Sequence, residues 1–225
     1  MTPALDAPPR PPVARKTNGR VPPAPPARGG DGDDDRDGTP PRRGLDNLRL
    51  ALLFFMGAEA MFFGALVSAL FVLRVGMAAW PPPLEPRLPV AVTAVNTVVL
   101  LGSSVSMAAA LRALRRTERR RFVTMLATTA ALGALFLLVQ GYEWIRLISF
   151  GLTLVSGVYG VTFYTLIGLH GLHVAGALVW LLATTLLAVR GRFSGPRIVP
   201  VQACAMYWHF VVGLWPGLFV AVYLL

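Results

Sequence analysis

The chain has 225 residues, of which 55% are hydrophobic and only 14% charged, and its formal net charge is +10. An ordinary soluble domain carries about a quarter charged residues, so this composition excludes that class. The arginines cluster between apolar stretches and not on one polar face, which argues against nucleic acid as a partner.

Residues 1–44 differ sharply from the rest of the chain. They are rich in proline, arginine and aspartate, as in "PPRPPVARKTNGRVPPAPPARGGDGDDDRDGTPPRRG". Such a segment cannot bury enough apolar surface to offset its conformational entropy, so we predict a disordered cytoplasmic tail. The remaining residues, 45–225, form the predicted membrane domain.

Long apolar stretches dominate this second part. A helix that spans a membrane needs about 20 mainly apolar residues. Five stretches meet this requirement, at about 48–73, 89–111, 122–141, 157–189 and 201–225. The sequence therefore predicts an all-α membrane protein with five transmembrane helices.

The basic residues indicate how these helices are oriented. Beyond the tail, they gather in the second and fourth connections, as Arg112, Arg115, Arg116, Arg119, Arg120, Arg121, Arg190, Arg192 and Arg197. Cytoplasmic loops collect arginine and lysine, so we place the N-terminus and both connections inside and the C-terminus outside. The acidic run "DGDDDRD" does not suit an organellar transit peptide, which makes a bacterial plasma membrane the simplest location.

Few polar side chains remain within the spans. Glu59, in "FFMGAEAMFFGALVSALF", lies near the middle of the first span, where a carboxyl group is costly and must face protein or water. It is either a proton-handling or lipid-headgroup residue, or a neutral acid hydrogen-bonded to a neighbouring helix. Asn96 is expected to hydrogen-bond between helices. Glu143 and Arg146, three residues apart, could pair across one helical turn.

Two histidines, His170 and His173, lie in the apolar run "TLIGLHGLHVAGALVW". A pair three apart on one helix cannot approach a haem from both sides of its ring, which excludes both as axial ligands of one haem. A copper or zinc site that adds His209 is possible by ligand type. The single cysteine, Cys204, rules out a cysteine metal cluster. Packing and hydrogen bonding is the favoured interpretation of the histidines.

Several motifs in a fixed order resemble one known family. They are "GAEAMFFGALVSALF", "AVNTVVLLGSSVSM", "LLVQGYEW", "SGVYGVTFYTLIGLHGLHVAGALVW" and "MYWHFVVGLWPGLFVAVYLL". Together they resemble subunit III of the haem-copper terminal oxidases of the cytochrome c oxidase type, from about residue 46 to the C-terminus. The chain is similar to the short five-helix form, which lacks the first two of the seven helices that many members have.

This resemblance implies a role in aerobic respiration. A subunit III carries no haem, copper or other metal, because those cofactors lie in subunits I and II. It would pack on subunit I, bind phospholipid, and support proton uptake and sustained turnover. Catalysis, the reduction of oxygen to water, would belong to the complex and not to this chain.

The resemblance also assigns individual residues. Glu59, Glu143, His170, His173 and His209 would form proton-related or buried polar groups, with Gln140 and Trp208 in lipid contact or helix packing. Asn96, as a polar residue of the second span, is expected to join the latter group. The chain departs from the family where Ser156 and Val212 replace two frequent aspartates, which puts any proton-related role at those positions in doubt.

Three other functions stay open at this point. The first is the related membrane subunit that accompanies bacterial nitric-oxide reductase. The second is a small proton-coupled transporter that uses Glu59, which would require further acids within the membrane. The third is a haem or copper protein in its own right, which the placement of the histidines weakens.

Overall fold

The computed structural model describes residues 43–80, 82, 88–192 and 199–225, with side chains from residue 47 onward. The predicted disordered tail therefore lies outside the described residues, except at its end, where the first helix begins.

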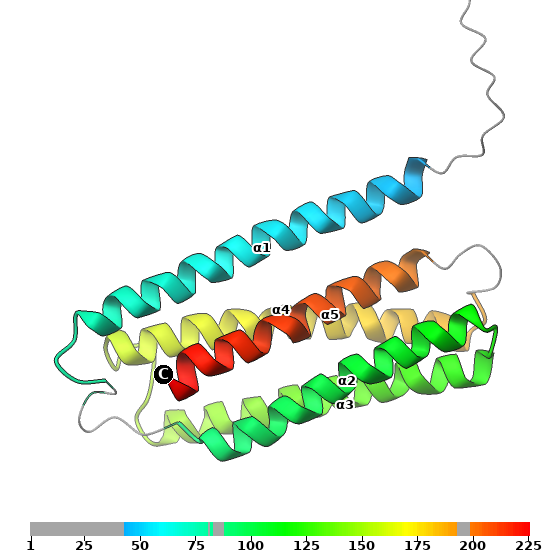
Figure 1. Cartoon of the computed structure of the whole chain (residues 1–225). Coiled ribbons are helices and arrows are strands. Elements are labelled where there is room, and N and C mark those ends of the chain that lie inside the picture. Colours follow the sequence, from blue (N-terminus) through cyan, green and yellow to red (C-terminus); the bar gives the residue numbers. More distant parts are fainter. Residues whose placement is uncertain (1–42, 81, 83–87, 193–198) are drawn as a thin grey trace, which may run out of the picture. The chain divides into compact units, whose positions relative to one another are not determined.

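The described part of the chain is helical (Figure 1). Its elements are α1 (Arg43–Val75), α2 (Val90–Arg115), α3 (Arg119–Ser149), α4 (Val158–Val189), α5 (Val199–Phe219) and a π-helical turn, η1 (Val220–Leu224). Five helices are long and apolar enough to cross a membrane. The predicted all-α class is confirmed, with five helices that are long and apolar enough to span a membrane.

The third helix is longer than the apolar stretch that predicted it. It continues to Ser149, because the segment after residue 141 keeps its backbone hydrogen bonds within the helix. The helix ends where Gly151 adopts a φ of +94°, a conformation that glycine reaches at little cost. The amide of Leu152 then bonds the carbonyl of Leu147 at 3.0 Å. Glu143 consequently lies inside a helix and not in a connection.

The helices pack unequally. The main contacts join α2 to α3, α4 to α5, α3 to α4 and α2 to α5, whereas α1 contacts α5 and α4 only sparsely. Along α1, Phe63 and Leu70 are buried, while other large side chains such as Phe54 (72% exposed) and Met61 (73% exposed) face outward. Most of the apolar surface of α1 is therefore available to lipid or to another chain.

The core is built around α5, which carries Trp208 and Trp215. Both indoles are almost completely buried. The six-membered ring of Trp208 lies directly over Gly133 of α3, where a Cβ atom would overlap it. Glycine at this position thus lets α3 and α5 approach closely, as small residues do in membrane proteins.

Replacing Gly133 with leucine is expected to destabilise the bundle, because the added side chain would overlap the buried ring of Trp208. Overpacking of a well-packed core costs about 1–3 kcal/mol. Gly141→Leu is the matched control, since Gly141 lies on the same helix with open space around its Cα. The single, buried cysteine provides the measurement. Alkylation of Cys204 during heating should begin at a lower temperature in Gly133→Leu than in Gly141→Leu. The same starting temperature in both variants would contradict the packing argument.

Candidate functional site

Glu59 on α1 contacts His173 on α4. The distance between Glu59 Oε2 and His173 Nε2 is 2.8 Å, and the two side chains are 18% and 19% exposed. A ring of Phe63 lies edge-on to the imidazole at 5.3 Å between centroids. Elsewhere on α1, the guanidinium of Arg49 donates to the side chain of Gln202. These two polar contacts join α1 to the rest of the described bundle.

The geometry of His173 shows which of its ring nitrogens carries a hydrogen. Its Nδ1 atom lies 2.6 Å from the backbone oxygen of Leu169. A carbonyl oxygen only accepts hydrogen bonds, so Nδ1 must carry a hydrogen. Nε2 then faces the carboxyl group of Glu59, whose Oε2 atom makes no hydrogen bond in this arrangement. Proton exchange between the two groups would require a reorientation that aligns the imidazole with the carboxyl group.

His170 has a different environment, although it is only one turn away. Its side chain is fully buried, and neither ring nitrogen has a hydrogen-bond partner. The imidazole stacks on Trp215 at 5.0 Å with an interplanar angle of 26°. Because the ring lies against Trp215 and Phe63, its visible role is packing between helices.

A line of hydrogen bonds joins α5 to α2. The indole of Trp208 donates to Ser103 Oγ at 3.1 Å, and that of Trp215 donates to Thr97 Oγ1 at 2.8 Å. Between them in the sequence, His209 Nδ1 bonds Ser104 Oγ. The small polar residues of α2 thus face α5. His209 belongs to this line of hydrogen bonds between α5 and α2 and not to the Glu59–His173 contact.

Glu143 forms a separate polar group at the start of α2, one turn before Thr97. Its carboxyl group is buried on α3 and lies 3.0 Å from Thr93 Oγ1 of α2. Gln140 Nε2 donates to Glu143 Oε2 and to Tyr223 Oη, both at 3.2 Å. Nearby, Asn96 Nδ2 donates to the backbone oxygen of Phe136 at 3.1 Å. These contacts tie α2, α3 and η1 together.

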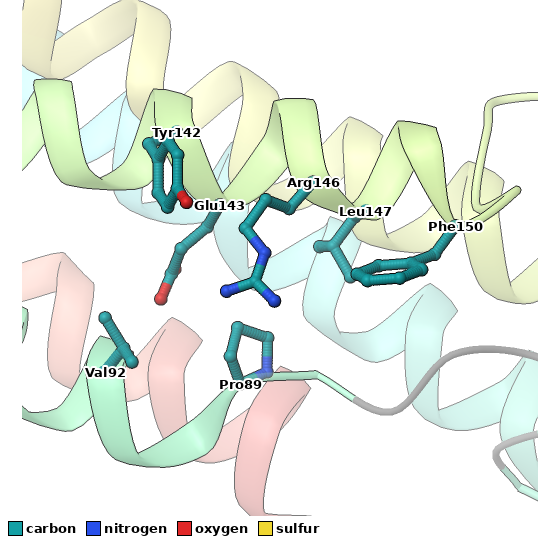
Figure 2. Close-up of a pocket in the computed structure, with 7 residues that line it drawn as sticks. All are labelled: Pro89, Val92, Tyr142, Glu143, Arg146, Leu147 and Phe150. Carbon is teal, nitrogen blue, oxygen red and sulfur yellow. The ribbon is translucent and has the colours of Figure 1, made fainter.

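The pairing of Glu143 with Arg146 that their spacing allowed is not formed in the described structure. Figure 2 shows both side chains extending from α3 toward the start of α2, side by side. The guanidinium of Arg146 lies 6.0 Å from the ring centroid of Tyr142 and 5.7 Å from that of Phe150. Glu143 instead takes its hydrogen bonds from Thr93 and Gln140.

The structure therefore does not bring the three histidines into one metal site. Among the described residues, no three His, Cys, Asp or Glu side chains are grouped so that they could hold a metal ion. Sequence reasoning overlooked Thr93, Trp215 and Tyr223 as members of the polar contacts. A signal existed for two of them, because Thr93 precedes Thr97 by four residues and Trp215 follows Trp208 by seven, spacings that share a helix face.

Proteins of known name resemble this chain over most of its length. The cytochrome c oxidase subunit III family model matches residues 38–225. Cytochrome c oxidase subunit 3 of Synechocystis sp. is 35% identical over 184 residues, which cover 81% of this chain and 78% of that protein. The protein of the same name from Sus scrofa is 32% identical over 182 residues, covering 78% and 69%.

A further relative is named probable cytochrome c oxidase subunit 3, from Nocardia farcinica. It is 36% identical over 183 residues, which cover 76% of this chain and 84% of that protein. The match to the family model includes every described helix, which confirms the resemblance seen in the motifs. The chain belongs to the cytochrome c oxidase subunit III family.

Proposed function

We propose that this chain is a non-redox accessory subunit of a cytochrome c oxidase complex that reduces oxygen to water in aerobic respiration. Its family implies membership of such a complex together with other oxidase subunits. Subunit I is the main contact and subunit II a second partner, and these two hold the haem and copper. The histidines of the described chain are not grouped as metal ligands, which is compatible with cofactors held by the partner subunits.

The observation that carries a proton-related role is the contact between Glu59 and His173. An acid and an imidazole lie 2.8 Å apart there, in the membrane-spanning part of α1 and α4, at side chains that are still partly exposed. Such a pair can take up and release a proton without a change in fold. We assign it to support of proton uptake by the partner subunit and thereby to sustained turnover.

The sparse contacts of α1 with the other described helices support a role in assembly and lipid binding. A helix with so few contacts to its own bundle leaves a continuous apolar surface. In the complex this surface would be covered by phospholipid and by subunit I.

The proposed orientation, with the N-terminus inside a bacterial plasma membrane, rests on the arginines. Arg119, at the start of α3, donates to the backbone oxygen of Val189 at the end of α4, at 3.0 Å. The α2–α3 connection and the end of α4 therefore meet, and the arginines of both lie at one end of the bundle. That concentration is typical of a cytoplasmic face.

The alternatives drawn from the sequence gain no support. The five spanning segments contain only two acids, Glu59 and Glu143, which is few for a proton-coupled transporter. The relatives described above are named as oxidase subunits and not as partners of nitric-oxide reductase.

Purification of the tagged chain in mild detergent tests the proposal. We expect haem-containing subunits to co-purify with it and the preparation to consume oxygen. After separation from those partners, this chain should show no haem Soret band and no stoichiometric copper or zinc. One bound metal per separated chain, or a preparation without oxidase subunits, would overturn the proposal.

A further inference from the structure

A small pocket lies where α2 begins and α3 ends (Figure 2). Its volume is about 150 Å³. The lining that matters here comprises Pro89 and Val92 of the α2 end, and Tyr142, Glu143, Arg146 and Phe150 of the α3 end. The pocket is separate from the contact between Glu59 and His173, and the role proposed above does not use it.

The pocket presents a cation and an acid that do not neutralise each other. Within the described part of the chain, Arg146 has no ion pair, and its contacts are with two aromatic rings. Glu143 has three hydrogen-bond contacts, to Thr93 and Gln140. A carboxylate has about four lone-pair sites, so at least one remains for a ligand. The first turn of α2, which has no acidic residue, adds partial positive charge beside Arg146.

An apolar groove continues from this pocket along the same two helices. It is lined mainly by Val92, Val95 and Val99 of α2 and by Leu135 and Val139 of α3, with a volume of about 480 Å³. Val92 lines both the pocket and the groove. The distance along α2 from Val92 to Val99 is about 10 Å at the usual helical rise. A pocket that carries one cation and one acid, next to an apolar groove, matches the shape and chemistry of a lipid.

We infer that the pocket and the groove together bind one zwitterionic phospholipid with a primary ammonium group, such as phosphatidylethanolamine. The phosphate contacts Arg146, whose planar guanidinium suits phosphate oxygens. The ammonium donates to Glu143, and one acyl chain lies in the groove. A quaternary ammonium cannot donate a hydrogen bond, and an uncharged glycerol headgroup leaves the carboxylate without a counter-charge. The inference rests on the proposed lipid-binding role and assigns it a place and a headgroup.

The test uses the tagged oxidase complex reconstituted in nanodiscs. Phosphatidylethanolamine, phosphatidylglycerol and phosphatidylcholine are supplied in equal amounts, and mass spectrometry measures the lipid retained after detergent washing. The site variants are Arg146→Gln, Glu143→Gln and Val95→Trp. Arg190→Gln is the control for loss of an exposed arginine. Val179→Trp is the control for an added indole, because Val95 and Val179 are both 67% exposed.

Each variant has its own expected result. Arg146→Gln should weaken retention of all three lipids about tenfold, through loss of a charge-assisted hydrogen bond. Glu143→Gln should abolish the preference for phosphatidylethanolamine over phosphatidylglycerol and leave total retention nearly unchanged. Val95→Trp should lower retention of every lipid by filling the groove. The two control variants should retain lipid like the wild type.

Several outcomes would overturn the inference. They are equal retention by site variants and controls, a wild-type preference for phosphatidylglycerol, or no retained lipid because a partner subunit covers this face. Co-purification of oxidase subunits and oxygen consumption are measured on the same samples. If these are normal while lipid retention does not follow the predicted pattern, only the lipid site fails. If the chain captures no oxidase subunits, the proposed function fails, and retention by the tagged chain still tests the site.

Discussion

Glu59→Ala is expected to loosen α1 and to reduce the amount of this chain in the purified oxidase. The substitution leaves the ring nitrogen of His173 without its partner and removes one of the two polar contacts of α1 to the described bundle. An orphaned polar group costs about 1–3 kcal/mol, which corresponds to roughly five- to 150-fold in an equilibrium constant. His173 is partly exposed, so the lower half of this range applies.

Glu59→Gln should separate this structural effect from proton handling. The amide has nearly the same shape and can donate to His173, so assembly should stay close to wild type. It cannot exchange a proton with the imidazole. The complex should therefore start turning over normally and then lose activity faster than wild type. This difference should be larger at about pH 8.5 than at about pH 6.5, because protons are scarcer in alkaline solution.

Oxygen consumption over time, with subunit content checked on gels, measures both effects. Gln202→Ala is the control, since it removes the other polar contact of α1 and leaves the contact between Glu59 and His173 in place. If Glu59→Gln and wild type inactivate identically at both pH values, and only Glu59→Ala loses assembly, Glu59 is an interhelical hydrogen-bonding residue without a proton-related role.

Trp215→Ala is expected to cause the largest loss of stability in the chain. The indole is fully buried, stacks on His170 at 5.0 Å, meets Phe136 edge-on at 5.1 Å and donates to Thr97. Truncation of a buried aromatic side chain to alanine costs about 3–5 kcal/mol. Trp215→Phe should cost less, because it retains most of the packing and loses mainly the hydrogen bond to Thr97.

Alkylation of Cys204 again provides the measurement, since this thiol is buried on the same helix. The temperature at which it becomes reactive should fall in the order wild type, Trp215→Phe, Trp215→Ala. Trp180→Ala serves as the control, because that indole is only partly buried and its ring contact, with Tyr207, is 6.0 Å away. A larger effect at Trp180 than at Trp215 would show that the core is not organised around α5.

The amino-acid sequence by itself determined the fold class and the five spans. A membrane interior offers no hydrogen-bond partners to backbone N–H and C=O groups. A long apolar segment therefore forms a helix, which satisfies these groups internally. The order of motifs was also sufficient to identify the family. The ends of the helices were harder to predict from the sequence, because α3 continues beyond its most apolar stretch until Gly151 ends it.

Only the tertiary structure decided which polar groups meet. His170 and His173 are neighbours on one helix, yet one stacks on Trp215 and the other lies 2.8 Å from the carboxyl group of Glu59. Glu143 has a cation one turn away but bonds Thr93 of another helix. In each case the partner lies far along the chain. Which groups meet then depends on the rotation and depth at which each helix packs, and these are set by the close fit of side chains such as Trp208 over Gly133 and not by local spacing.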